Sequence, residues 1–563
     1  MAGNVLHSPP RFPPRLGRLK AELAGIFLTN FIILIRGKIN ENELMVVMTK
    51  MSSERKSVLE MTAAEARAFF LKSSSYVNIV LPEYFDFQPV LDFAFSKVSG
   101  SRLKSMIDFQ ILKTAENANY SIILNKDAGY DWREVKIVHP FLYADLVEQI
   151  TEEDHWKELL ARFDLFESNP KIKCISLPVK STGKKGDTAE TILNWWEELE
   201  QTSIVKSLEY TYCIRTDIIN CYGSIYTHTI DWAIRGKDVA KKATAKGKDR
   251  SFAHMLDWTV EKLQCNQTNG IPQGGELFNF IAEIVLGYSD FLLSEELKDI
   301  SDLDWLVVRY RDDYRIFSNS KEVAEKILKT IADILSGLNM HFNIKKTGLV
   351  TDIIESAIKP DKVYWNSRVP IIMPKVWDGK YRRVNYQLTL QKHLLEILWL
   401  SKKFPNSGSV SKALTSFAKR LDQQKSIDES IMPLVSIVAE IVSKNPKAIA
   451  SGVGVLSKLL LKGHTELSKS ADIVSKITKK LENTPNLEYL DVWLQRLSLL
   501  SGSEPTLSGK MCNAVRDHDY SIWDSSFIRI KMNLPSIIDE TKIQAIKPEI
   551  STEIFDVFSD YDA

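Results

Sequence analysis

Two adjacent carboxylates between two apolar stretches are the first residues in this chain with the chemistry of a reactive site. Asp312 and Asp313 separate residues 305–310 from residues 314–317, and both stretches are rich in aromatic and β-branched residues. The pattern predicts a hairpin with both carboxylates in its turn. Burying two like charges there is unfavourable unless a cation offsets them, and Mg²⁺ prefers such hard oxygen ligands. A solvated turn would be the interpretation of the same pair standing alone.

A third carboxylate, Asp217, follows another apolar stretch, which predicts a buried strand over residues 210–218. If that strand lies beside the hairpin, three carboxylates meet at one place and can hold two metal ions. A two-metal site activates an attacking 3′-hydroxyl and stabilises the pyrophosphate that leaves in an in-line displacement. The three aspartates are therefore the candidate metal ligands.

Helices and strands of ordinary length must position these residues. We expect a mainly helical region over 52–165, a strand and a basic turn over 171–187, a long apolar helix over 276–294 and an amphipathic helix over 321–338. Asp378-Gly379 marks a hairpin turn, and residues 232–250 are polar and basic. From about residue 386 the apolar residues recur at helical spacing in units of roughly 40 residues, which favours a helical solenoid.

Four segments in a fixed order resemble the reverse transcriptase family and cover about residues 205–350. They are Asp217 after its strand, Gly270-Ile271-Pro272-Gln273-Gly274, Tyr310-Arg311-Asp312-Asp313 and Asn343-Ile344-Lys345-Lys346-Thr347. The resemblance implies an α+β fold, in which reverse-transcriptase fingers and a palm carry the active site. It also implies that Asp217, Asp312 and Asp313 bind Mg²⁺, with Mn²⁺ as an alternative.

The resemblance gives further residues a role at the nucleotide. Tyr222 matches the aromatic residue that closes the sugar pocket, where a ring excludes a 2′-hydroxyl. Gln273 and Gly274 match the loop whose backbone approaches the incoming nucleotide and the template. Lys346 matches the lysine proposed to donate a proton to pyrophosphate. Core packing, an ordinary turn and a surface lysine are the respective structural alternatives.

Arg311 departs from the family pattern, because most familiar members carry Ala, Val or Met beside the two aspartates. A long cation there could bind a phosphate, restrict the primer or pair with an acid. It casts doubt on ordinary processive copying but not on metal binding. Arg311 is therefore a further candidate nucleotide-binding residue.

The surrounding sequence resembles one branch of the family, the bacterial abortive-infection and defence-associated reverse transcriptases. The resemblance rests on residues 71–87, on residues 233–237 and on the stretch that leads into Gly270. This branch carries an all-α, HEAT-like C-terminal domain in place of the usual thumb. The expected organisation is an uncertain or disordered N-terminal arm (1–50), an N-terminal and fingers region (51–205), a palm (206–385), a helical HEAT-like domain (386–535) and an acidic tail (536–563).

This branch is implied to synthesise DNA from dNTPs in defence against phage. Two modes stay open: template-independent synthesis primed by a protein hydroxyl, which leaves the DNA covalently attached, or copying of a partner non-coding RNA. No primer can be chosen among 18 tyrosines, although Tyr76 and Tyr84 lie in the recognisable N-terminal region. The alternative outside enzyme chemistry is an inactive palm that binds RNA or supports assembly. A homo-oligomer is expected, since some members assemble through the helical domain.

Composition sets limits of its own. The 563 residues carry 73 lysines and arginines against 72 aspartates and glutamates, and a net charge of +1 argues against binding DNA by bulk charge alone. Residues 235–250 are nevertheless locally basic. The five cysteines form no C-x-x-C pair, which favours a reducing cytoplasm over a disulfide framework. No apolar run is read as spanning a bilayer, so no membrane association is expected.

Overall fold

The computed structural model describes residues 55–557 apart from short gaps, which are residues 101–102, 127–129, 183–186, 246–248, 378–381, 385, 428–429, 464–466, 502–506 and 531. The chain divides into two compact units, a small one (Met1–Lys56 with Ser181–Gly183) and a large one (Ser57–Lys180 with Lys184–Ala563). Every candidate site residue belongs to the large unit. The predicted N-terminal arm over residues 1–50 lies outside the described residues.

Five strands form the sheet at the centre of the predicted palm, in the order β4, β7, β8, β6, β9. Their bounds are Ile172–Cys174 for β4, Tyr212–Asp217 for β6, Trp305–Tyr310 for β7, Asp313–Ser318 for β8 and Gly348–Val350 for β9. β4 pairs with β7 in parallel, and the other neighbours pair antiparallel. The strand predicted over 210–218 and the hairpin predicted at Asp312-Asp313 are therefore both present.

Helices precede the sheet and connect its strands. The first group is α3 (Ala63–Phe70), α4 (Ser73–Tyr76), α5 (Gln88–Val98), α6 (Phe109–Leu112), α7 (Pro140–Ile150) and α8 (Glu153–Phe166). The second group is α9 (Asp187–Trp195), α10 (Thr202–Lys206), α11 (Cys221–Ser224), α12 (His228–Arg235), α13 (Lys237–Ala245), α14 (Phe252–Lys262), α15 (Glu276–Glu296), α16 (Lys321–Gly337), α17 (Ile353–Ala357) and α18 (Pro360–Ile372). The helices predicted over 276–294 and 321–338 are α15 and α16.

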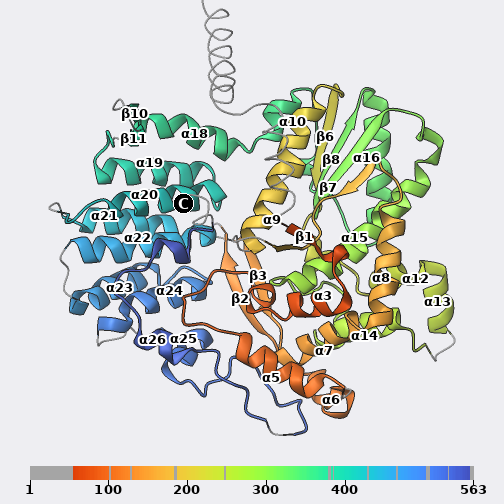
Figure 1. Ribbon diagram of the computed structural model, residues 1–563, viewed down its shortest axis with the longest axis horizontal. Coiled ribbons are helices and arrows are strands. Elements are labelled where there is room, and N and C mark those ends of the chain that lie inside the picture. The colour runs from red at the N-terminus through yellow and green to blue at the C-terminus, as the bar shows by residue number, and fades with distance from the viewer. Residues whose placement is uncertain are drawn as a thin grey trace, which may run out of the picture. The chain divides into compact units, whose positions relative to one another are not determined.

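Side chains of β7 alternate between the two faces of the sheet, as the period of a strand requires. Trp305 and Val307 belong to the main core, whereas Leu306 and Val308 pack into a second, smaller cluster. α15 and α16 pack on the main core side (Figure 1). Because both faces of the central strands are buried, polar groups that must reach a substrate lie at the strand ends.

α15 is, among the described residues, the one helix long and apolar enough to cross a membrane by length and composition. Of its most apolar window, 83% is buried inside the protein, as in a core helix. α15 is the long apolar helix predicted over 276–294, and by these criteria the prediction that no apolar run reaches bilayer-spanning length does not hold for it. Glu283 and Asp290 interrupt the run, and both point inward to a buried arginine of the sheet.

Two parts of the chain before residue 251 differ from the prediction. Helices form most of the regular structure over 52–165, as predicted, but an antiparallel hairpin of β2 (Tyr120–Asn125) and β3 (Trp132–Ile137) lies among them. β3 is exposed over its first half, so its sequence lacks the alternation that marks a strand. The polar and basic stretch 232–250 forms the second half of α12 and all of α13, in keeping with its alanines and lysines.

The described chain after residue 386 is helical, with strand-like pairing limited to isolated bridges. The helices are α19 (Leu390–Lys403), α20 (Gly408–Asp422), α21 (Met432–Val442), α22 (Ile449–Lys462), α23 (Leu467–Leu481), α24 (Glu488–Ser498), α25 (Lys510–Arg516) and α26 (Glu540–Gln544). Contacts join α19 to α21, α20 to α22 and α22 to α24, and Figure 1 shows α19 to α24 as a stack. Just before it, β10 (Lys375–Trp377) pairs with β11 (Arg382–Val384) across the predicted Asp378-Gly379 turn, which itself is not described.

Asparagine side chains tie successive turns of this stack together. The Asn445 side chain accepts a hydrogen bond from the Asn406 amide at 2.6 Å, and the Asn406 side chain accepts one from the Lys447 amide at 3.0 Å. Asn406 and Asn486 both have a left-handed φ, which asparagine tolerates better than most residues. These turns recur at the interval of roughly 40 residues that the sequence suggests.

Residues 536–557, the described part of the predicted acidic tail, pack against two distant parts of the large unit. The Asp539 amide donates to the Tyr84 carbonyl at 2.8 Å. Further on, the Glu549 carboxylate pairs at 2.5 Å with Lys458 of α22, whose side chain is 2% exposed. The acidic groups of this segment therefore serve contacts within the chain.

Candidate active site

The register of the sheet brings the three predicted metal ligands to one edge. Asp217 is the last residue of β6 and pairs with Asp313, the first residue of β8. Asp312 lies just before it, in the two-residue turn after β7, and its carbonyl accepts a hydrogen bond from the Ile218 amide at 3.0 Å. Asp217 is buried, Asp312 is half-buried and Asp313 is exposed, so the group faces outward from the sheet.

Lys346 reaches the same edge from the segment after α16. The Asn343 amide donates to the Asp217 carbonyl at 2.8 Å, which docks this segment beside β6. The Lys346 ammonium then donates to Asp217 Oδ2 at 2.5 Å. That hydrogen bond raises the pKa of Lys346, so the lysine stays protonated. The predicted proton donor thus contacts the first predicted metal ligand.

The negative charge of this edge is only partly compensated, which fits a divalent cation. Asp217 Oδ1 is buried and has no hydrogen-bond partner among the described residues. Desolvation, and then the charge of Asp313, raises the pKa of Asp312 to about 6. Desolvation, and then Asp217, likewise raises the pKa of Asp313. A bound cation would remove these penalties, since it supplies positive charge and fills the free lone pair.

The oxygen atoms of the three palm carboxylates are nevertheless not all close to one another. Two other groups of described residues bring three ligand atoms within 4.8 Å of one another: His228 with Asp257 and Glu261, and Asp231 with Asp249 and His254. The palm aspartates do not form such a group, and Lys346 holds one oxygen of Asp217. This edge is therefore open, as expected of a site that admits a substrate as well as an ion.

Tyr222, the predicted sugar-pocket residue, is held in place by α15. Its hydroxyl donates to Asn279 Oδ1 at 2.5 Å, and the Asn279 amide in turn donates to Glu276 at 2.9 Å. Burial raises the pKa of Tyr222, so the phenol stays neutral. A ring fixed in this way can act as a steric barrier, because it cannot swing aside without breaking the hydrogen bond.

The loop that contains Gln273 and Gly274 seats the β2–β3 hairpin. The Gln273 carbonyl accepts from the Lys136 amide at 2.7 Å, and the Gly274 carbonyl accepts from the Asn78 amide at 2.9 Å. Gly274 has a φ of +143°, and a Cβ there would lie 2.7 Å from a methyl group of Val135. The close approach of the β2–β3 hairpin therefore explains why residue 274 is a glycine. The approach of its backbone to a nucleotide stays a prediction.

Arg311 occupies the first position of the catalytic turn with a φ of 53°, a left-handed value that is strained for arginine. Its guanidinium lies 5.7 Å from the centre of the Tyr310 ring, and its Nε is buried with no hydrogen-bond partner among the described residues. Tyr222, Tyr310 and Glu276 raise the pKa of Arg311 in spite of its burial. The cation therefore points among the residues predicted to surround the nucleotide.

A buried network behind the turn was missed by the sequence analysis. Arg309 of β7 is fully buried and pairs at 2.7 Å with both Glu283 and Asp290 of α15. Glu283 also accepts from the Ser176 hydroxyl at 2.6 Å, and that hydroxyl accepts from the Arg311 amide at 2.8 Å. The chain of contacts anchors the strained turn to the helix beneath it. A signal was present, since Glu283 and Asp290 are seven residues apart on one face of an otherwise apolar helix.

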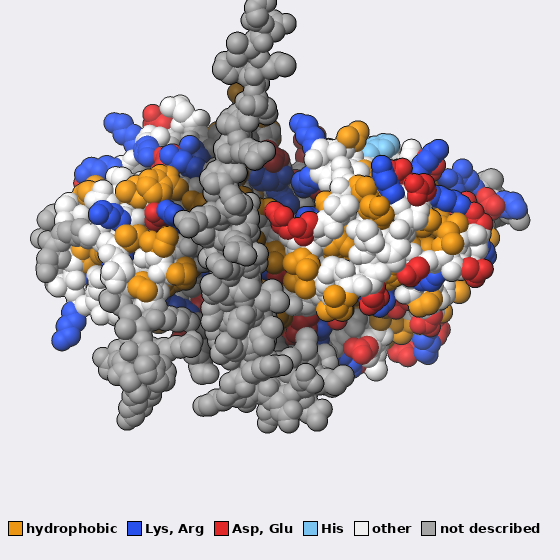
Figure 2. All heavy atoms as spheres, turned by 90° about the horizontal axis from the view of Figure 1, so that it is seen from above, with side chains coloured by type: hydrophobic (Ala, Val, Ile, Leu, Met, Phe, Trp, Pro, Cys, Tyr) orange, Lys and Arg blue, Asp and Glu red, His pale blue; other side chains and the backbone are white. Residues whose placement is uncertain are grey.

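Three cations from separate regions are coupled electrostatically, and one of them, Lys359, is also coupled to Asp313. Desolvation, and then the like charges of Arg133 and Lys359, lowers the pKa of Lys447 in the helical stack. Desolvation also lowers the pKa of Lys359, which Asp313 partly opposes. These side chains form a second set of candidate phosphate contacts. On the face shown in Figure 2, basic and acidic side chains are interspersed, in keeping with the near-zero net charge.

Other residues singled out in the sequence have structural partners. Arg235, the first cation of the basic stretch, pairs at 2.6 Å with Asp231 and with Asp249. Tyr76 and Tyr84 are buried at 2% and 0% exposure, and the Tyr76 hydroxyl donates to the Val138 carbonyl. Neither tyrosine is accessible as a primer in this conformation.

Comparison with known families identifies the central part of the chain. Residues 173–387 match the family described as "Reverse transcriptase (RNA-dependent DNA polymerase)". The chain contains a reverse transcriptase domain. It is an RNA-directed DNA polymerase by this domain, that is, a nucleotidyltransferase, and such domains use divalent metals. The match spans all three aspartates, Tyr222 and Lys346.

Similar solved structures include two telomerases. The structure of apo telomerase from Candida tropicalis has 12% sequence identity and a TM-score of 0.28, and the match covers 76% of this chain and 74% of that chain. Telomerase from Candida albicans in complex with a TWJ fragment of telomeric RNA has 11% identity and a TM-score of 0.28, covering 72% and 69%. No curated protein matches the sequence. The identification rests on the domain alone.

Proposed function

We propose that the reverse transcriptase domain is an active, Mg²⁺-dependent DNA polymerase that adds dNTPs at the edge formed by Asp217, Asp312 and Asp313. The observation that carries this proposal is the β6–β8 register, which sets Asp217 opposite Asp313. The buried, unpaired Oδ1 of Asp217 supports it, because an idle scaffold gains nothing from an unsatisfied carboxylate oxygen.

The chain's own residues divide the work at this edge. The three aspartates would hold Mg²⁺ or Mn²⁺, which when bound supplies the charge that favours 3′-hydroxyl attack and release of pyrophosphate. Lys346 carries a proton next to Asp217, which supports a role as proton donor to the leaving pyrophosphate. The Tyr222 ring, fixed by Asn279, bars a 2′-hydroxyl and thereby selects deoxynucleotides.

We further propose that the polymerase belongs to the defence-associated branch and acts against phage in the cytoplasm. Two observations favour this branch: the sequence resemblance around the palm, and the stacked helices from α19 to α24 that stand after the palm and fit a HEAT-like domain. We extend the proposal to the organisation predicted from the sequence and to a homo-oligomer formed through the helical domain.

Template-independent, protein-primed synthesis is the mode we favour, and it leaves the DNA covalently attached. The unusual Arg311 supports it, since it sets a cation beside Tyr310 in the turn that carries Asp312, where most familiar members carry Ala, Val or Met. Copying of a partner non-coding RNA is the second candidate. The cations Arg133, Lys359 and Lys447 favour that candidate, because together they can contact a nucleic-acid backbone.

One experiment separates these possibilities. Purified protein is incubated with single dNTPs and Mg²⁺, with and without nuclease pretreatment, and compared with Asp312→Ala. DNA that stays attached to protein after nuclease pretreatment supports the templateless mode, and loss of product after pretreatment supports a bound RNA template. No incorporation by the wild type, or full incorporation by Asp312→Ala, refutes the polymerase site.

A further inference from the structure

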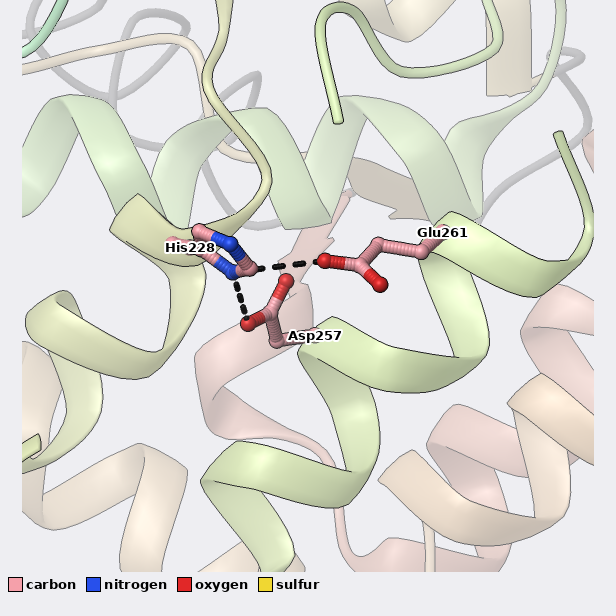
Figure 3. A group of neighbouring side chains, drawn as sticks. All are labelled: His228, Asp257 and Glu261. Carbon is pink, nitrogen blue, oxygen red and sulfur yellow. Dashed lines mark hydrogen bonds and ion pairs between the residues drawn. The ribbon is translucent and has the colours of Figure 1, made fainter. Parts of the chain in front are cut away.

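A second group of metal-ligating side chains lies away from the palm aspartates, where α12 begins and α14 ends. His228 is the first residue of α12, and Asp257 and Glu261 are four residues apart on α14, which places them on one helix face. His228 Nδ1 lies 2.6 Å from Asp257 Oδ2 and 3.3 Å from Glu261 Oε1 (Figure 3). The three side chains thus point toward a common centre.

One carboxylate oxygen of Asp257 is an unsatisfied hydrogen-bond acceptor at this centre. The residue is 3% exposed, and its Oδ1 is buried with no hydrogen-bond partner among the described residues. In Figure 3 this oxygen points into the space between His228 and Glu261. The His228 side chain is 40% exposed, so an ion can reach the centre from solvent.

The separations suit a small transition-metal ion. Ligand atoms about 2.0–2.1 Å from a tetrahedral Zn²⁺ lie about 3.3 Å from one another, and this is the separation of His228 and Glu261. His228 Nδ1 is hydrogen-bonded to Asp257 Oδ2, so metal binding would release the shared proton to solvent, and Asp257 would ligate through its free Oδ1. One imidazole and two carboxylates suit Zn²⁺ or Mn²⁺ and leave one position for water.

A neighbouring group, also one histidine and two carboxylates, shows how a side chain of the protein can take the place of a metal ion. Asp231, Asp249 and His254 also lie with ligand atoms within 4.8 Å of one another. The Arg235 guanidinium, however, lies 2.6 Å from both of these aspartates. The positive charge of Arg235 thereby balances the two aspartates, and its guanidinium occupies the position that a metal ion would need. Among the three side chains at His228, no arginine or lysine pairs with either acid in the described chain.

We propose that His228, Asp257 and Glu261 form a structural binding site for one divalent transition-metal ion, with Zn²⁺ as the best fit. The site is distinct from the palm metals and does not depend on the proposed polymerase activity. An ion there fastens the start of α12 to the end of α14.

A metal ion at this site would also help to position the segments that form the predicted nucleotide pocket. Just before α12, the Thr227 amide donates to the Thr268 carbonyl at 2.8 Å, and the Ile271 amide donates to the Tyr222 carbonyl at 2.9 Å. The two paired segments carry Tyr222 and lead into Gln273. The ion therefore holds the segments that carry Tyr222 and Gln273 in place, and its ligands are positioning residues.

The test measures zinc directly, in full-length protein that carries Asp312→Ala so that the palm ligands are disrupted. After removal of metal by a chelator, the protein is titrated with Zn²⁺ against a chromophoric competitor. We expect one zinc per chain, and an affinity weaker by at least about 10–100-fold with Glu261→Gln and with His228→Gln, since that is the loss for an outer-shell partner alone. The matched control is His254→Gln, from the centre that Arg235 fills, and it should bind zinc as the parent does.

Thermal unfolding with and without Zn²⁺ supplies a second readout that needs no activity. Zn²⁺ should raise the unfolding temperature of the parent and of His254→Gln but not that of Glu261→Gln. Glu261→Gln, a change that keeps the size of the side chain, keeps the test decisive if His228→Gln does not fold. Zinc bound equally by the parent and Glu261→Gln, or no zinc bound by the parent, would overturn the proposal.

Discussion

Two groups of acids lie at the β7–β8 hairpin, one against Arg309 of β7 and the other at the turn, and their charges are balanced in different ways. Behind the hairpin, Glu283 and Asp290 are both paired with the fully buried Arg309. At its turn, Asp312 and Asp313 meet Asp217, and of these three only Asp217 has a close ion pair among the described residues. The first group holds the fold together, whereas the second keeps an electrostatic deficit that a metal ion can fill.

Removal of the buried cation should give the largest change in stability. Arg309→Met leaves Glu283 and Asp290 as uncompensated buried charges, and we expect the free energy of unfolding to fall by about 3–5 kcal/mol in urea denaturation. Adding Glu283→Gln and Asp290→Asn removes those charges and should recover part of the loss. A loss below about 1 kcal/mol for Arg309→Met would mean that the two groups of acids do not differ as described.

Lys346 is the exposed counterpart of Arg309, and its loss should affect catalysis more than folding. We expect Lys346→Met to slow dNTP incorporation by about 100-fold, since a proton donor is removed. Stability should change by less than about 1 kcal/mol, because the lysine side chain is 66% exposed. Lys345→Met, a change at the adjacent exposed lysine, is the matched control. Equal activity of the two variants would contradict the role of Lys346.

The raised pKa of Asp312 predicts a pH dependence of metal use. A carboxyl with a pKa of about 6 is ionised above that pH and neutral below it, so protons compete with the metal near pH 6 rather than near pH 4. We expect the Mg²⁺ concentration for half-maximal incorporation to rise about tenfold for each pH unit below 6. A requirement that stays constant from pH 7.5 to pH 5 would contradict this account.

Arg311 should give the smallest effect, because it lies beside the aspartates rather than among them. We expect Arg311→Ala to raise the KM for dNTPs by about three- to tenfold and to change product length or nucleotide choice. Arg311→Gly keeps the left-handed φ of the turn without strain, so it separates the loss of charge from the backbone effect. Products of unchanged length and composition in both variants would show that the cation has no part in nucleotide choice.

The sequence predicted the aspartates at the hairpin turn, but it did not predict the buried ion pairs of Arg309. Asp312 and Asp313 stand between two short apolar strands, and Asp217 ends a third, so local patterns place all three at strand ends. The partnership of Arg309 with Glu283 and Asp290 joins β7 to a preceding helix, and no local pattern names the partner of a buried charge. The β2–β3 hairpin was missed for a related reason, since its exposed first half carries no alternation of apolar residues. His228 comes from α12, whereas Asp257 and Glu261 come from α14, so their approach depends on how the two helices pack and not on a local pattern.

The most direct test of the central claim is a paired measurement of activity and stability on Asp312→Asn. If the three aspartates carry an uncompensated charge kept for metal ions, dNTP incorporation falls by at least about 10³-fold. The free energy of unfolding in the absence of metal stays the same or rises, because one of three repelling carboxylates is gone. Incorporation within tenfold of the wild type, or a loss of activity accompanied by clear destabilisation, would contradict the claim.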